Sequence, residues 1–120
     1  MTPEEYLNTA LADGWSNIHG WGFVVTYKQH EYDSALAWFT RSNASPSYED
    51  ILTKIIEMDG TLHFKDMEGD MSVRLTKDLL HTNIKKVPTG VLRAIEDMEY
   101  DAYTTDEFLQ YILFKEITFG

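Results

Sequence analysis

The stretch that most constrains the fold is residues 61–76, TLHFKDMEGDMSVRLT. Two runs within it alternate apolar and polar residues, and a short segment around Gly69 separates them. The alternating apolar residues are Leu62, Phe64, Met71, Val73 and Leu75. Because successive side chains of a strand point to opposite faces, this alternation on both sides of a Gly-containing loop predicts a half-buried β-hairpin.

Helix signals precede the hairpin. Thr2 and Glu5, with Pro3 between them, form a capping box for a first helix. We expect this helix to end at Asp13-Gly14, because a glycine after the last periodic apolar residue is a common helix stop.

Two further capped helices lie on either side of the hairpin. Ser47 caps an amphipathic stretch that closes at Asp59-Gly60, and Thr76 caps another that Pro88 ends.

Two more helices are expected towards the C-terminus. One follows Gly90 and carries apolar residues through Met98. Thr104 and Glu107 form a capping box for the last helix, 105–116, which is apolar almost all round. A helix of that kind is either central to the core or faces a partner, so it is a candidate interface for a homodimer.

The remaining elements complete the expected fold. Residues 23–27, FVVTY, predict a buried strand from their β-branched and aromatic content. Residues 31–39, EYDSALAWF, fit a strand or a helix, and their partial alternation favours a strand paired with 23–27. We therefore expect a single α+β domain over residues 1–120, with a small antiparallel sheet centred on the 61–76 hairpin and about five helices packed on one side.

Composition excludes several classes of protein. The chain has no cysteine, which excludes disulfides, thiolate zinc sites and cysteine nucleophiles. No apolar run approaches the ~20 residues of a membrane span, and the acidic, amphipathic N-terminus is unlike a signal peptide. We expect a cytoplasmic protein.

The charge is strongly negative and unevenly spread. The net charge is −10, which disfavours direct binding to nucleic acid or to a membrane. Residues 90–120 hold seven acids and two bases. Such a surface is either a solubilising one or one that imitates nucleic acid and binds a basic partner. The candidate partner-binding residues are Glu96, Asp97, Glu99, Asp101, Asp106 and Glu107.

Motifs for catalysis or metal binding are not evident. The four histidines do not have the spacing of a zinc site, and the serines lack the Gly-x-Ser-x-Gly setting of a nucleophile. We expect no enzyme, no cofactor and no metal. The interpretation that we favour least is a weak enzyme or metal protein that uses His30, Asp33, His63 and Asp66.

Aromatic residues crowd the first third of the chain. Trp15 and Trp21 lie beside Gly14, Gly20 and Gly22, a setting that can form a stacking pocket for a flat ligand such as a nucleobase. The same rings can equally form the core of a small α+β domain. A small-ligand or nucleotide-sequestering protein is therefore the alternative to a protein-binding one.

The C-terminal residues 103–120, YTTDEFLQYILFKEITFG, carry a resemblance, together with Gly60-Thr61-Leu62 and the LTKDLL of residues 75–80. They resemble small, mostly uncharacterised proteins of bacteriophages, prophages and other mobile elements. Those chains close on an Asp-containing helix, a Gln-Tyr-Ala-Leu-Phe-Gly-Glu-like run and a terminal aromatic-Gly pair. Here Ile112 stands in place of the alanine and Lys115 in place of the glycine.

This resemblance covers about half the chain and carries over no catalytic residues. It implies an accessory protein of a phage or mobile element that acts inside a bacterial cell. Together with the acidic residues 96–107, it leads us to expect a non-catalytic accessory or anti-defence protein. Such a protein would bind a host protein that has a basic surface.

Overall fold

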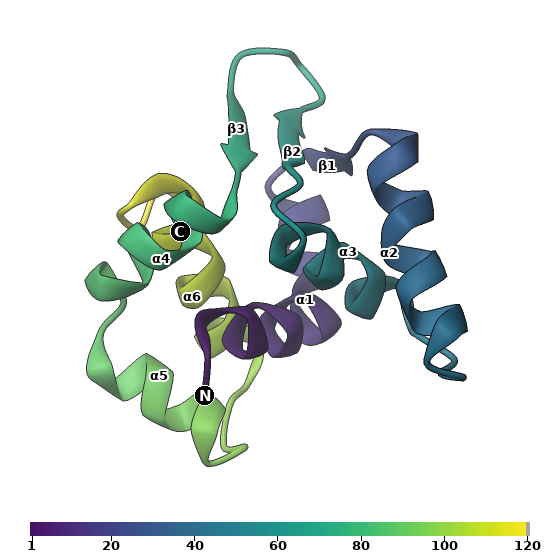
Figure 1. Cartoon of the computed structure of the whole chain (residues 1–120). Helices are drawn as coiled ribbons and strands as arrows, with labels where there is room; N and C mark the ends of the chain where they lie inside the picture. The colour runs from purple at the N-terminus through teal and green to yellow at the C-terminus, as the bar shows by residue number, and fades with distance from the viewer. Residues whose placement is uncertain (120) are drawn as a thin grey trace.

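The computed structural model describes residues 1–119, and Gly120 lies outside the described residues. Along this part of the chain, six α-helices and one short 3-10 helix accompany three strands (Figure 1). The elements are α1 (Pro3–Gly20), β1 (Phe23–Thr26), α2 (Gln29–Arg41), α3 (Tyr48–Glu57), β2 (Leu62–Asp66), β3 (Ser72–Leu75), α4 (Lys77–Asn83), η1 (Ile84–Lys86), α5 (Thr89–Glu96) and α6 (Ala102–Phe114). The α+β class is confirmed.

The predicted hairpin is formed by β2 and β3. The three strands are antiparallel in the order β1-β2-β3, so the first strand of the hairpin is central. Phe64 lies opposite Val25 on one side and Val73 on the other. Leu62, Phe64 and Leu75 are fully buried, whereas Lys65 and Arg74 are exposed. The helices therefore cover one face of the sheet, as the alternation predicts.

The core lies between this face and the helices. Its fully buried side chains come from α1, α3, α6 and the sheet, and include Leu7, Leu11, Ile18, Leu52, Ile55, Ile56, Phe64, Phe108, Leu109 and Ile112. The helix pair in most extensive contact is α1 and α6. The first and last helices of the chain therefore pack against each other in the core.

The helix caps agree with three of the sequence expectations. Thr2 and Ser47 each form a capping box at the start of α1 and α3, and the Thr76 side chain accepts a hydrogen bond from the backbone of Leu79 at the start of α4. These motifs are local, so they form wherever the following residues turn into a helix.

The expected end of the first helix at Asp13-Gly14 is wrong. Helix α1 continues to Gly20, and Gly14 is a buried position in its interior. An ideal Cβ at Gly14 would lie 2.6 Å from Leu109 Cδ1. The glycine therefore serves the close approach of α1 and α6 instead of ending the helix.

The strand expected at 31–39 is also wrong, because these residues belong to helix α2. Tyr32, Ala35 and Phe39 follow helical spacing and face the core side of the helix. The partner of β1 is β2. The strand at 23–27 is confirmed over 23–26, although Val24 is 37% exposed, so β1 is half-buried at the edge of the sheet.

The last helix begins earlier than the capping box at Thr104 and Glu107 predicts. Helix α6 starts at Ala102, because Asp101 accepts a hydrogen bond from the Thr104 backbone N–H at 2.9 Å and Thr104 bonds back to the Asp101 N–H. Phe108, Leu109, Ile112 and Leu113 are buried inside this chain. Burial in the core accounts for its apolar character, so the homodimer through 105–116 stays an untested prediction.

Substituting Gly14 tests the α1–α6 contact. We expect Gly14→Ala to lower the free energy of unfolding, because overpacking of about 1–3 kcal/mol exceeds the helix-propensity gain of about 0.5–1 kcal/mol. Gly20→Ala is the control, since nothing lies within 4 Å of a Cβ there. Urea denaturation measures both, and equal stability of the two variants would contradict this account of Gly14.

Candidate functional site

The six candidate carboxylates lie along one surface segment, residues 96–107, which we call the acidic segment. It comprises the end of α5, the connection to α6 and the first turns of α6. Among residues 1–119 the ion pairs join Lys54 to Glu57, Lys77 to Asp59 and His81 to Glu4. None of them includes a carboxylate of the acidic segment, so its negative charge is not neutralised within the described chain.

Three of the six carboxylates have structural roles. Glu96 accepts a hydrogen bond from the Tyr6 hydroxyl, which ties the end of α5 to α1. Asp101 is the N-cap of α6, and Asp106 accepts hydrogen bonds from the Gln110 amide at 3.2 Å. The backbone N–H of Thr104, followed by its hydroxyl, lowers the pKa of Asp101.

The other three carboxylates are free of such roles. Asp97, Glu99 and Glu107 are exposed, and within the described part of the chain their side chains make no hydrogen bond or ion pair. They are the members of the acidic segment whose charge is available to a partner without loss of an internal contact.

Two large side chains stand out from the acidic segment. Met98 is 80% exposed and Tyr103 is 78% exposed, the two highest values among the exposed large hydrophobic side chains. Met98 also has a left-handed backbone, with φ of 57°. This conformation closes α5, because the N–H of Met98 bonds to the Ile95 carbonyl and the N–H of Glu99 to the Ala94 carbonyl.

The sequence-predicted Trp21 lies next to the acidic segment. A hollow of about 430 Å³ lies between α1 and α6, lined by Ser16, Asn17, Gly20, Trp21, Ala102, Tyr103 and Asp106. The structure thus brings Trp21 and Asp106 to one site. The Trp21 ring is stacked on Phe119, with ring centroids 5.5 Å apart and planes inclined by 9°, so a ligand cannot stack on that face.

The sequence-predicted Trp15 is elsewhere. It lines a separate hollow of about 370 Å³ with His19, Val24, Val25 and Tyr48. Its ring lies 5.7 Å from that of Tyr48, where burial raises the pKa of the Tyr48 hydroxyl to about 12. The two tryptophans therefore do not form a shared stacking pocket.

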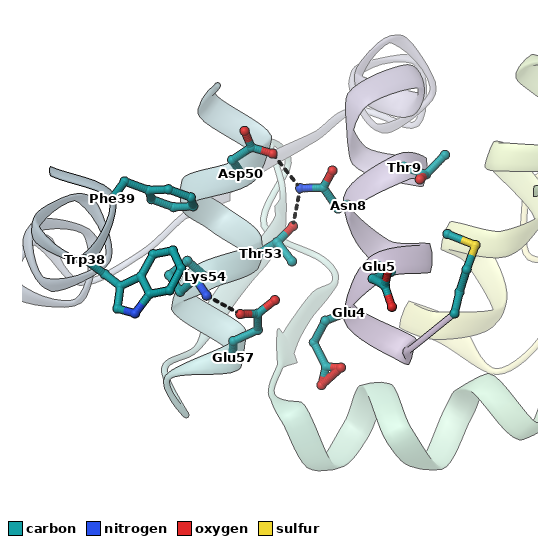
Figure 2. Close-up of a pocket in the computed structure, with 11 residues that line it drawn as sticks. Glu4, Glu5, Asn8, Thr9, Trp38, Phe39, Asp50, Thr53, Lys54 and Glu57 are labelled. Atoms are coloured by element: carbon teal, nitrogen blue, oxygen red, sulfur yellow. Dashed lines mark hydrogen bonds and ion pairs between the residues drawn. The ribbon is translucent and has the colours of Figure 1, made fainter. Parts of the chain in front are cut away.

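A third hollow is a groove of about 450 Å³ between α1, α2 and α3, shown in Figure 2. Asn8 bridges α1 to α3 by donating hydrogen bonds to Asp50 at 2.9 Å and Thr53 at 3.3 Å. Lys54 pairs with Glu57 and lies over the ring of Trp38, 3.7 Å from its centroid.

The carboxylates of this groove are already engaged. Glu4 contacts His81 at 2.5 Å, Glu5 accepts from the Thr2 N–H, and Asp50 accepts from the Ser47 N–H. Partial burial raises the pKa of Asp50, but hydrogen bonds from Asn8 and Ser47 outweigh it, so its pKa is lowered. The described residues that line the groove include no histidine, serine or cysteine, so its chemistry is that of polar and cation–aromatic contacts.

The predicted histidine–carboxylate pairs lie on separate elements, with His30 and Asp33 on α2 and His63 and Asp66 on β2. His63 and Asp66 are three residues apart on β2, so their side chains point to opposite faces of the sheet. In the residues that the structure describes, no three histidine, aspartate or glutamate side chains converge on a point where a metal could bind.

None of the helices in residues 1–119 has the length and apolar character needed to cross a membrane.

Sequence reasoning missed the groove and the exposed side chains of the acidic segment. The groove depends on how three successive helices pack against one another, and no local sequence pattern indicates that packing. The left-handed backbone of Met98 has no local sequence signal either, because glycine is the residue expected there.

Comparison with protein-family models, with curated proteins and with solved structures gave no match to this chain.

The structural role of the Asp101 carboxylate, as the N-cap of α6, can be tested by its effect on stability. Its folded pKa is lowered, so the unfolded chain takes up the proton first as pH falls, and the stabilisation is lost below the ordinary aspartate value of about 3.9. Asparagine still caps a helix but does not take up a proton. When the pH is lowered from 7 to below about 3.9, we therefore expect Asp101→Asn to lose less stability than the native chain does.

Asp101→Ala is the matched variant, and it should be less stable than Asp101→Asn at pH 7, because alanine cannot accept the Thr104 N–H. Thermal unfolding followed by circular dichroism measures all three proteins. An unchanged acid sensitivity in Asp101→Asn would contradict the assignment.

Proposed function

We propose that this chain is a non-catalytic binding protein that docks on a basic surface of another protein through the acidic segment. The observation that carries the proposal is the exposure of Met98 and Tyr103 among carboxylates that have no internal cation partner. Protein interfaces are rich in methionine and tyrosine at their centre and place charged residues at the rim. The acidic segment has that composition.

The hollow beside Trp21 supports a basic partner in preference to a phosphate. Asp106 and the Tyr103 ring border it, and its lining residues, all within 1–119, include no lysine or arginine. A lysine or arginine of the partner would find a carboxylate and an aromatic ring there. A nucleotide would instead bring its phosphates next to a carboxylate, which disfavours the alternative of nucleotide sequestration at this hollow.

The biological setting of the proposal rests on the resemblance of residues 103–120 and 60–80 to phage and mobile-element proteins. In that setting the partner is a protein of the bacterial host, and the chain is an accessory or anti-defence protein that acts in the host cytoplasm. The proposed surface imitates the negative charge of a nucleic acid backbone.

Reversing the three free charges tests this proposal. We expect the triple variant Asp97→Lys, Glu99→Lys and Glu107→Lys to stay folded, because these side chains have no internal contacts, and to lose the bound protein. The measurement is a pull-down from bacterial lysate at low and high salt, read by mass spectrometry. Binding by the native chain should weaken at high salt, since exposed charges are screened.

The control is a second triple variant, which has the same net charge as the first but changes residues on the opposite side of the molecule. Glu68→Lys and Asp70→Lys lie in the loop between β2 and β3, and Glu116→Lys lies beyond the far end of α6 (Figure 1). This variant should keep the bound protein. Loss of binding in both variants would mean that only total charge matters, and retention in both would refute the acidic segment as the docking site.

Met98 gives a second prediction with two readouts. Met98→Gly should raise the free energy of unfolding by about 1 kcal/mol, because glycine relieves the left-handed backbone, and should weaken binding, because the exposed side chain is lost. The control is Lys115→Gly, which relieves a φ of 69° at the end of α6. It should gain similar stability and bind as the native chain does.

A Met98→Gly variant that binds as well as the native chain would remove Met98 from the interface. Denaturant titration measures stability, and surface plasmon resonance against the protein captured in the pull-down measures binding. If the native chain captures no protein at either salt concentration, the small-ligand alternative takes the place of this proposal.

A further inference from the structure

Helix α2 lies at the periphery of the molecule. In Figure 1 it forms the right-hand edge, and among the described elements its extensive contact is with α3. Ala35 is its only buried residue, flanked by Tyr32 and Phe39 on the side that faces α3. The opposite side of α2 faces solvent.

That outer side carries a defined stripe. A shallow hollow of about 330 Å³ runs along it, lined by Asp33, Leu36, Ala37, Thr40 and Arg41. These residues are spaced by three or four, so they share one face of the helix. Leu36 is 37% exposed, and the small Ala37 lies at the middle of the stripe. We call this face the α2 stripe.

The charges of the α2 stripe are symmetric about its centre. Asp33 and Arg41 each lie four residues from Ala37, one towards each end of the helix. In residues 1–119 neither takes part in an ion pair, and the carboxylate of Asp33 accepts one hydrogen bond, from Gln29 at 2.9 Å. Asp33 and Arg41 are eight residues apart, which is about 12 Å along the helix axis, so the two charges are too far apart to pair within one chain.

We infer that the α2 stripe is a surface for a second copy of this chain. When two α2 helices lie antiparallel with Ala37 at their crossing, each Asp33 faces the Arg41 of the other copy, and the twofold axis produces two such ion pairs. The small side chain of Ala37 lets the helices approach closely, and the Leu36 side chains flank the crossing.

The dimer is weak and depends on concentration. Stable interfaces bury about 800 Å² per partner, and a single helix of 13 residues, about 20 Å long, offers less than that along one stripe. This association goes beyond the proposed function, because the acidic segment belongs to α5 and α6 and lies away from α2 (Figure 1).

A charge swap in the full chain tests the inference by sedimentation velocity over a concentration series. The native chain should pass from monomer to dimer as concentration rises. Asp33→Arg or Arg41→Asp should each weaken the dimer by about tenfold, because each turns both symmetric ion pairs into repulsions. The double variant Asp33→Arg with Arg41→Asp restores opposite charges and should dimerise as the native chain does.

Two controls accompany the swap. Asp70→Arg and Arg93→Asp change the charge by the same amounts outside α2 and should leave the dimer unchanged, and circular dichroism checks that α2 is still helical. Three results would overturn the inference: a native chain that is monomeric at every concentration, a dimer that persists in both single variants, or a folded double variant that stays monomeric.

Discussion

The close approach of α1 and α6 at Gly14 is the constraint on which the rest of the structure depends. An ordinary side chain there would collide with Leu109, whose burial is complete. Once the two helices are in contact, Tyr6 stacks on Phe108 with ring centroids 6.1 Å apart, and Asn17 donates a hydrogen bond to the Ala102 carbonyl at 3.0 Å. The start of α6 is thereby fixed to α1.

This contact also positions the acidic segment. The segment contains the loop that connects α5 to α6, and α1 holds this loop at both ends, through the bond from Tyr6 to Glu96 and the bond from Asn17 to Ala102. A loop anchored in this way presents Met98 and its neighbouring carboxylates on a rigid base, which lowers the entropy lost on binding. The α1–α6 contact therefore serves the proposed docking surface as well as the core.

Local signals predicted the parts of the fold that local interactions determine. The hairpin and the caps at Thr2, Ser47 and Thr76 depend on neighbouring residues, so the sequence was sufficient for them. Gly14 lies inside α1 because it faces Leu109, 95 positions further along the chain, and no nearby residue carries that information. The pattern of residues 31–39 favours a strand because a peripheral helix with one buried residue has weak apolar periodicity.

The sequence was sufficient to predict which acidic residues make up the candidate site, but not how their side chains are arranged. Composition located the carboxylates, yet only the structure separates Glu96, Asp101 and Asp106, which hold the fold, from Asp97, Glu99 and Glu107, which do not. Trp15 and Trp21 are six residues apart, and the unexpected continuation of α1 to Gly20, with Trp21 as its C-cap, places them roughly 120° apart around the helix axis. Their separation into two hollows follows from that single change.

The two proposed surfaces have a joint consequence. Helix α2 and the acidic segment lie at opposite edges of the molecule, so a twofold dimer through α2 leaves both acidic segments free (Figure 1). A dimer of that form can hold two basic surfaces at once. Against a partner that is itself a dimer, the second contact becomes intramolecular and strengthens binding without any new interaction. The weak α2 contact and the salt-sensitive acidic contact would then reinforce one another.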